Sequence, residues 1–123
     1  MKMNSPLISL DYQSRIPIYE QIVNNIEKYV ALGILKPRDQ VPSIREMASS
    51  LGVNPNTVKK AYDILENRNI ITTISTKGTF ISDDTKRATE DKINREIEMI
   101  KKKIEELSKM GISKEEIMGM IKR

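Results

Sequence analysis

Apolar residues recur at helical spacing near the start of the chain. Between residues 17 and 33 they fall every three or four positions, which is typical of one buried face of an α-helix; they are Ile18, Ile22, Ile26, Tyr29 and Val30. Pro17 suits the first helical position, and Gly33 is placed to end the helix in a left-handed conformation. Residues 34–42 contain two prolines and are therefore predicted to form an extended connection.

Two shorter helices are predicted next, with a glycine-containing turn between them. The first starts after Ser43, which has the spacing of a capping box with Glu46, and its apolar stripe is Ile44, Met47, Ala48 and Leu51. The second covers residues 54–67, with Asn54 as its N-cap, and its inward face is Val58, Ala61, Tyr62 and Leu65. Two short helices joined in this way are typical of a helix-turn-helix, whose second helix enters the major groove of DNA.

Residues 70–82 predict a β-hairpin. Residues 70–74 are rich in β-branched side chains, residues 75–78 form a turn, and residues 79–82 return as a second strand. Asn69 is expected to take the left-handed conformation before the first strand. Because an isolated hairpin is marginally stable, we expect Ile71 and Phe80 to pack into the core. The hairpin then forms the wing of a winged helix-turn-helix over residues 1–82.

Residues 83–123 predict two further helices. The first covers residues 86–110 and carries a heptad seam of Ile93, Ile97, Ile100, Ile104 and Leu107. After Gly111, Ser113 and Glu116 have capping-box spacing, and the final helix is expected to bury Ile117, Met120 and Ile121. A region this small cannot bury both stripes alone, so we expect two copies of the chain to pair through it. Packing of the helices back onto the winged domain is the alternative.

The expected fold class is therefore mainly α with a small β-hairpin. The net charge of +4 permits a polyanionic partner but does not require one. Cysteine and histidine are absent, which excludes thiolate metal sites and removes the commonest general base. Because the sequence also lacks a glycine-rich phosphate loop and a nucleophile paired with a base, we predict no enzyme activity, catalytic residue, metal or cofactor. It has no apolar run of membrane-spanning length and no signal-peptide core, so the expected location is the cytoplasm.

Three segments carry a resemblance to a known family: PIYEQI (17–22), VPSIREMASSLGVNPNTVKKAYDILE (41–66) and KGTFI (77–81). In this order and spacing they resemble the GntR family of bacterial regulators, and within it the YtrA-like branch. The resemblance implies that Arg45 contacts DNA from the helix that starts after Ser43, and that Lys77 and Gly78 form the wing tip near the minor groove. It also implies that the helix of residues 54–67, the recognition helix, lies at the major groove or its phosphates. The expected DNA-binding residues are Ser43, Arg45, Asn54, Asn56, Thr57, Lys59, Lys60, Lys77 and Gly78.

Each of these roles has a structural alternative. Lys59 and Lys60 also fit a solvated helix face, and Asn54 is in the first place a helix cap. Arg45 also fits a surface ion pair with Asp39 or Glu46. Thr76 stands where the family commonly has glycine, and Pro55 stands where other branches carry arginine, so the base contacts of those branches are not transferred to this chain.

The function that these features predict is a homodimeric repressor that binds an inverted-repeat operator in duplex DNA. By resemblance, it controls its own or a neighbouring operon, with an ABC transporter operon as the example from the YtrA-like branch. The alternative is a winged-helix module that binds a protein partner without sequence-specific DNA binding. No small-molecule effector is specified by the sequence.

Overall fold

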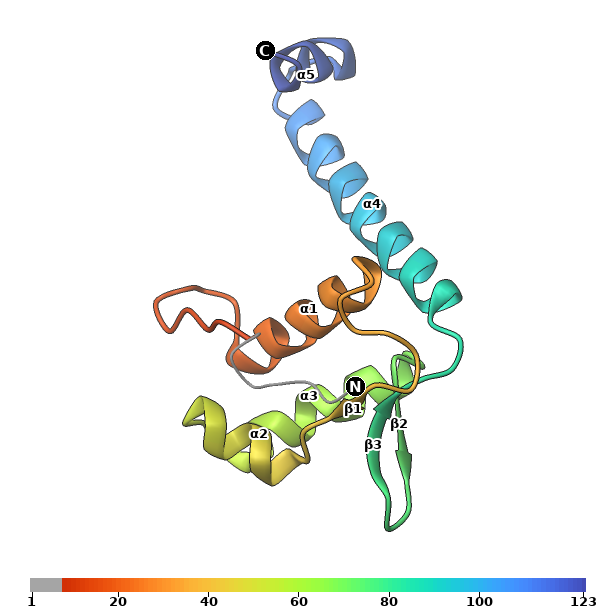
Figure 1. Cartoon of the computed structure of the whole chain (residues 1–123). Helices are drawn as coiled ribbons and strands as arrows, with labels where there is room; N and C mark the ends of the chain where they lie inside the picture. The colour runs from red at the N-terminus through yellow and green to blue at the C-terminus, as the bar shows by residue number, and fades with distance from the viewer. Residues whose placement is uncertain (1–7) are drawn as a thin grey trace. The chain divides into compact units, whose positions relative to one another are not determined.

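The computed structural model describes residues 8–123, which fall into two compact units (Figure 1). The first unit ends at Thr89, and the second runs from Glu90 to Arg123. The division therefore lies within the helix α4 (Lys86–Ser108), whose first turn buries Ala88 in the core of the first unit. No helix of residues 8–123 has both the length and the apolarity that a membrane span needs.

The first helix, α1 (Ile18–Ala31), forms as the apolar spacing predicts. Ile22 and Ile26 are completely buried, and Val30 is nearly so. The helix ends in the predicted left-handed glycine, with φ of +75° at Gly33. The buried side chain of Gln21, in the first turn of α1, holds the segment that precedes the helix. Its amide oxygen accepts the Asp11 N–H (2.8 Å), and its NH₂ group donates to the Asp11 carbonyl (2.9 Å).

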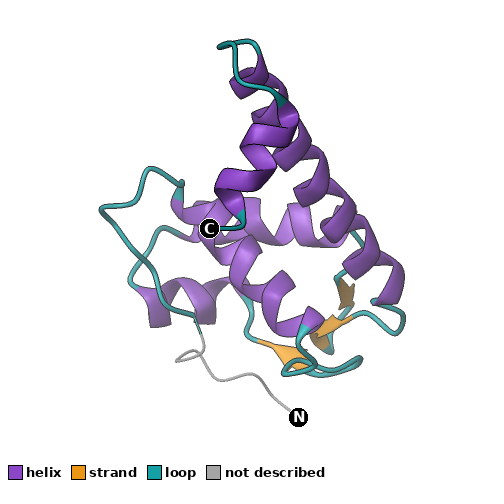
Figure 2. Cartoon of the chain, turned by 90° about the horizontal axis from the view of Figure 1, so that it is seen from above, coloured by secondary structure: helices purple, strands orange, loops and turns teal. Residues whose placement is uncertain are grey.

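The helix-turn-helix consists of α2 (Ile44–Leu51) and α3 (Pro55–Asn67). The predicted capping box is present, because the Glu46 N–H donates to Ser43 Oγ (3.1 Å) and the Ser43 N–H donates to the Glu46 carboxylate (3.2 Å). Gly52 ends α2 with φ of +67°. Both α1 and α2 pack against α3, and the buried side chains of these helices belong to one core. Figure 2 shows the helices of the chain in purple and its strands in orange.

The sheet has three antiparallel strands in the order β1-β3-β2. The predicted hairpin is present as β2 (Ile71–Ile74) and β3 (Gly78–Ile81), preceded by Asn69 with φ of +60°. The strand β1 (Gln40–Val41) lies in the segment that was predicted only as an extended connection. Such a short strand has no hydrophobic alternation of its own, and it exists because Gln40 and Val41 pair with β3.

The predicted core position of Phe80 is wrong. Ile71 pairs with Ile81, and both side chains are buried on the face of the sheet that meets the helices. Phe80 pairs with Thr72 one position away, so its side chain lies on the opposite face and is half-exposed. The hairpin is therefore anchored to the core by its isoleucines.

The second unit contains the rest of α4 and the short helix α5 (Lys114–Ile121). Gly111, with φ of +92°, separates them, and α4 ends slightly before the predicted Met110. Half of the predicted capping box is present, since Ser113 Oγ accepts the Glu116 N–H (3.1 Å). The reciprocal bond differs, because the Ser113 hydroxyl donates to the Glu116 carboxylate (3.3 Å) in place of the Ser113 backbone N–H. The predicted buried face of α5 is wrong for the single chain, where Ile117 is buried but Met120 and Ile121 are 55% and 63% exposed.

Candidate DNA-binding surface

The helix α3 has one buried and one polar face. Its inward residues are almost completely shielded from solvent, with Val58, Ala61 and Leu65 at 0% exposure. The exposed face is polar and consists of Asn56, Lys59, Lys60 and Asp63. The contacts with α1 and α2 hold this helix firmly, so the polar face is displayed on a rigid support.

The start of α3 is organised by Asn54. The side-chain oxygen of Asn54 accepts the Asn56 N–H (2.8 Å), and its carbonyl accepts the Thr57 N–H (3.0 Å). The cap therefore occupies the amide oxygen of Asn54 and leaves its NH₂ group as the donor that can meet a phosphate. The side chain of Asn56 is exposed beside it, whereas that of Thr57 is half-buried.

The two lysines of α3 have different surroundings. Lys59 Nζ lies 2.9 Å from the Asp63 carboxylate one turn later, and both side chains are more than half exposed. Lys60 Nζ instead lies 4.0 Å from the centre of the Tyr19 ring, which belongs to α1. The positive charge of Lys59 is thus partly neutralised within the helix, while that of Lys60 rests on an uncharged aromatic face.

At the N-terminus of α2, Arg45 is exposed. In the part of the chain that the structure describes, it forms neither of the alternative ion pairs, with Asp39 or Glu46. The Asp39 carboxylate is directed elsewhere and accepts the Lys36 N–H (2.9 Å), a hydrogen bond that lowers the pKa of Asp39. Ser43, also exposed, uses its hydroxyl oxygen to cap the helix. Arg45 is therefore a cation available to an external anion.

The wing tip is a tight turn with two residues of positive φ. Thr76 has φ of +66°, which explains why glycine is common at this position, and Gly78 has φ of +123°. A Cβ atom on Gly78 would lie 2.7 Å from the side-chain nitrogen of Gln40 in β1. Lys77 is exposed between them, so the tip presents a cation on a backbone whose positive φ angles disfavour larger side chains.

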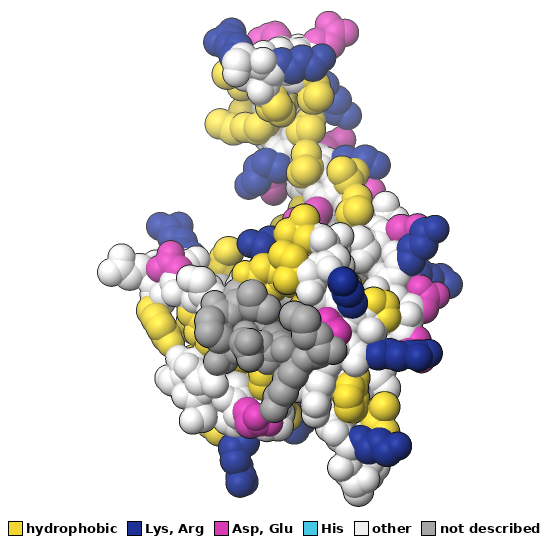
Figure 3. Space-filling view, in the orientation of Figure 1, with side chains coloured by type: hydrophobic (Ala, Val, Ile, Leu, Met, Phe, Trp, Pro, Cys, Tyr) yellow, Lys and Arg dark blue, Asp and Glu magenta, His cyan; other side chains and the backbone are white. Residues whose placement is uncertain are grey.

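The second unit carries an apolar groove between α4 and α5 with a volume of about 350 Å³. Yellow hydrophobic side chains are visible on α4 and α5 in Figure 3. The groove brings together all of the predicted dimerisation residues except Ile93 and Ile97, which lie further along α4 and are also exposed. Its lining is Ile100, Lys103, Ile104, Leu107, Ile112, Ile117, Met120 and Ile121.

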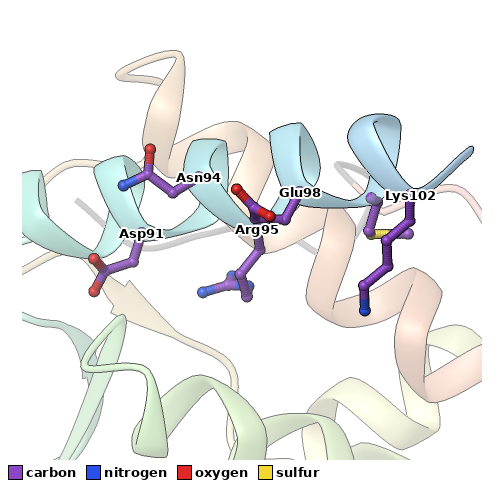
Figure 4. Close-up of a pocket in the computed structure, with 6 residues that line it drawn as sticks. Asp91, Asn94, Arg95, Glu98 and Lys102 are labelled. Carbon is purple, nitrogen blue, oxygen red and sulfur yellow. The ribbon is translucent and has the colours of Figure 1, made fainter. Parts of the chain in front are cut away.

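Two other hollows among residues 8–123 are open to solvent. The residues in Figure 4 recur along one side of α4, and the space beside them is open to solvent; they are Asp91, Asn94, Arg95, Glu98, Met99 and Lys102. Another shallow hollow lies on the outer face of the wing, beside the exposed ion pair of Arg38 with Asp83 (2.7 Å) and the half-exposed ring of Phe80. Among residues 8–123, no cluster of acidic side chains is suited to a metal ion.

Tyr19 is a neighbour of the recognition helix α3 that was not predicted from the sequence. Tyr19 is half-buried and packs against the core next to the apolar stripe of α1. The available signal was its spacing, three positions before the buried residue Ile22 and seven before the buried residue Ile26, which places it on the apolar side of the helix. Only the packing of α1 against α3 shows which residue it meets.

Comparison with known proteins decides the family. The sequence model of the family described as "Bacterial regulatory proteins, gntR family" matches residues 18–81, which contain α1, the helix-turn-helix and the wing. The chain belongs to the GntR family. The HTH-type transcriptional repressor YtrA of Bacillus subtilis (strain 168) is 39% identical over 117 residues, which cover 94% of this chain and 90% of that protein.

Solved structures share the fold of this GntR protein. A transcriptional regulator from Oenococcus oeni is 38% identical with a TM-score of 0.73, and the match covers 93% of this chain and 95% of that one. The DNA-binding domain of AraR, solved in complex with operator ORX1, is 24% identical, and the match covers 60% of this chain and 92% of that one. Its TM-score of 0.53 shows a similar fold. The predicted family, fold class and regulatory rather than enzymatic function are confirmed, and the chain is a DNA-binding transcription regulator.

Proposed function

We propose that this GntR protein is a homodimeric repressor that binds an inverted-repeat operator in the cytoplasm. The observation that carries the proposal is the polar outer face of α3, displayed above a fully buried inner face. A helix with this division of residues fits the major groove, because its exposed side can donate to and accept from base edges.

In this proposal the contacts divide into base reading and phosphate binding. Asn56 reads an adenine edge, since its amide can donate and accept together. The residues that bind or approach phosphates are Ser43, Arg45, Asn54, Thr57, Lys59, Lys60, Lys77 and Gly78. Arg45 carries an unpaired charge on α2, and Lys77 extends the contact surface to the wing. The electrostatic contacts give affinity, and the contacts to base edges give sequence preference.

The second unit is the proposed dimerisation surface. Exposed isoleucines follow one side of α4 and continue into the groove against α5, an arrangement that leaves a large apolar surface in water unless a second copy covers it. The proposed dimerisation residues are Ile93, Ile97, Ile100, Ile104, Leu107, Ile117, Met120 and Ile121. A two-fold dimer presents two copies of α3 to half-sites separated by a whole number of helical turns.

The regulated operon is proposed from similarity. The B. subtilis relative is named a repressor, and the chain matches it along most of its length. We therefore propose repression of its own or a neighbouring operon, with an ABC transporter operon as the first candidate. The competing function, docking of a protein helix on α3, is disfavoured because the outward positions of α3 are occupied by Asn56, Lys59, Lys60 and Asp63.

Footprinting and gel-shift measurements on the DNA upstream of the protein's own gene test the operator. We expect protection of an inverted repeat and clear preference over a shuffled duplex of the same composition. Equal affinity for both duplexes would contradict operator recognition and favour the interaction module.

The dimer is tested with two exposed residues of α4. Ile100→Asp places a charge in the apolar groove and is expected to give a monomer in sedimentation, with weakened binding to the inverted repeat. The matched control is Met99→Asp, at an exposed position on the other side of the same helix, which is expected to remain dimeric. A wild-type monomer with full affinity for the repeat would overturn this part of the proposal.

A further inference from the structure

Tyr19 places an aromatic ring under a cation of the recognition helix. The residue lies in the first turn of α1, and its half-buried ring packs against the core, which limits its movement. Lys60 Nζ lies 4.0 Å from the centre of this ring, well within the range of a cation–π interaction. The contact therefore joins a fixed ring on one helix to a flexible side chain on another.

The neighbouring lysine shows why an aromatic partner matters. Lys59 Nζ lies 2.9 Å from Asp63, and this carboxylate neutralises part of its charge. An aromatic face attracts an ammonium group through its quadrupole but carries no net charge. Lys60 is therefore oriented without losing the net charge that a phosphate would attract.

We propose that Tyr19 is a positioning residue for DNA binding, which holds the ammonium group of Lys60 ready for a backbone phosphate. A free lysine side chain loses rotamer freedom when it binds, and a lysine that is already oriented loses less. The ring covers one side of the ammonium group, and the exposed position of Lys60 leaves its other N–H donors open to a phosphate oxygen. Tyr19 itself needs no contact with the DNA.

This inference rests on the proposed DNA-binding surface, but it concerns a contact that does not depend on base sequence. The probe is therefore a duplex of random sequence, with affinity measured over a series of salt concentrations. Loss of operator preference would leave this measurement intact, so failure of the operator proposal and failure of the Tyr19 proposal are distinguishable.

The central experiment is a double-mutant cycle with Tyr19→Leu and Lys60→Gln. Removal of the ring is expected to weaken binding by about two- to ten-fold, the cost of ordering one long side chain on binding. Lys60→Gln is expected to reduce the slope of log affinity against log salt by about 0.9, the contribution of one phosphate contact. In the Lys60→Gln background, Tyr19→Leu should then have no further effect.

Two further variants separate positioning from folding. Tyr19→Phe keeps the ring and is expected to restore binding that Tyr19→Leu loses. Tyr29→Leu removes another half-buried ring from α1, one that lies 5.3 Å from Lys28 rather than beside α3, and is expected to leave DNA affinity unchanged. All variants are compared at equal folded fraction, measured by urea unfolding.

A direct readout is the proton NMR shift of the Lys60 ε-methylene group, which a ring this close displaces. We expect the displacement to persist in Tyr19→Phe and to vanish in Tyr19→Leu. The proposal is overturned if Tyr19→Leu weakens binding equally with and without Lys60, or if it removes the NMR displacement without changing affinity.

Discussion

Arg68 and Glu27 join the end of the recognition helix to α1. Arg68 Nη1 lies 2.9 Å from Glu27 Oε1, and the Glu27 side chain is only 1% exposed, while that of Arg68 is 35% exposed. Arg68 directly follows α3. A buried carboxylate needs partners that replace water, and Arg68 is one such partner, so the pair ties the end of α3 to α1.

Arg68→Ala is therefore expected to destabilise the fold. The substitution leaves the Glu27 charge without this partner, and we expect the free energy of unfolding to fall by about 3 kcal/mol. Urea unfolding at constant protein concentration measures the loss. The double variant Glu27→Gln with Arg68→Met should recover most of the stability, and a double variant as unstable as Arg68→Ala would contradict this explanation.

Asp39 predicts a stability change in acid. The Lys36 N–H donates to its carboxylate and lowers the pKa of Asp39 in the folded protein. A lowered folded pKa means that the stabilising contribution is complete above the unfolded value, about 3.9, and disappears as the pH falls through the folded pKa. The free energies of unfolding of wild type and Asp39→Asn, measured with urea, should differ at neutral pH and converge as the pH falls below the folded pKa of Asp39. If the free energies of unfolding of the two proteins fell in parallel across this range, another carboxylate would be responsible for the loss of stability in acid.

Gly78 is expected to resist substitution because of its backbone conformation. Its φ of +123° is unfavourable for other residues, whereas the atom that an added Cβ would approach to 2.7 Å, Gln40 Nε2, is the end of a flexible side chain that can move away. Gly78→Ala should lower the free energy of unfolding by about 1–3 kcal/mol. In a Gln40→Ala background the backbone strain remains, so we expect most of the loss to persist. Disappearance of the loss in that background would assign the effect to the contact with Gln40.

Arg45 and Asn56 are expected to affect DNA binding differently. Arg45→Gln removes a phosphate contact, so affinity should fall by a similar factor for the operator and for random DNA. Asn56→Ala removes a base contact, so operator affinity should fall by about 1–3 kcal/mol while random DNA is bound as before. Gel shifts with both duplexes measure the two effects. If Asn56→Ala weakened both complexes equally, its role in reading bases would be wrong.

Asp63 is expected to restrain the charge of Lys59. Asp63→Asn removes the carboxylate 2.9 Å from Lys59 Nζ and frees the ammonium group for the DNA backbone. We expect tighter binding to random DNA and a salt slope that is steeper by up to about 0.9. Asp63→Asn combined with Lys59→Gln should lose the steeper slope, and a slope that remained steep would show that Lys59 is not the cation released.

The helix boundaries could be predicted because their signals are local. The reciprocal bonds of Ser43 and Glu46 at the start of α2, and the left-handed Gly33 and Gly52, involve residues within a few positions of each other. The apolar spacing likewise predicted the buried side chains of α3 and three of those in α1, whereas Ile18 and Tyr29 are only partly buried. Family membership followed from the same motifs, and the family match to residues 18–81 confirms it.

The positions of Phe80 and β1 could not be predicted in the same way. Phe80 is half-exposed because the register of β3 against β2 places Ile81, one residue later, on the buried face. β1 is too short for a periodic signal and forms only where β3 offers it hydrogen bonds. Met120 and Ile121 are apolar and on the predicted face of α5, but a single chain supplies no surface to cover them.

The amino-acid sequence by itself determined the order of the helices and strands, their caps and the polar face of α3, because these depend on residues that are neighbours along the chain. Only the tertiary structure decided which partners those polar side chains have: Asp63 for Lys59, Tyr19 for Lys60, and Glu27 for Arg68. Except for the pair within α3, these partners are separated by about forty residues. Contacts at that separation arise from helix packing, and no local pattern in the sequence predicts them.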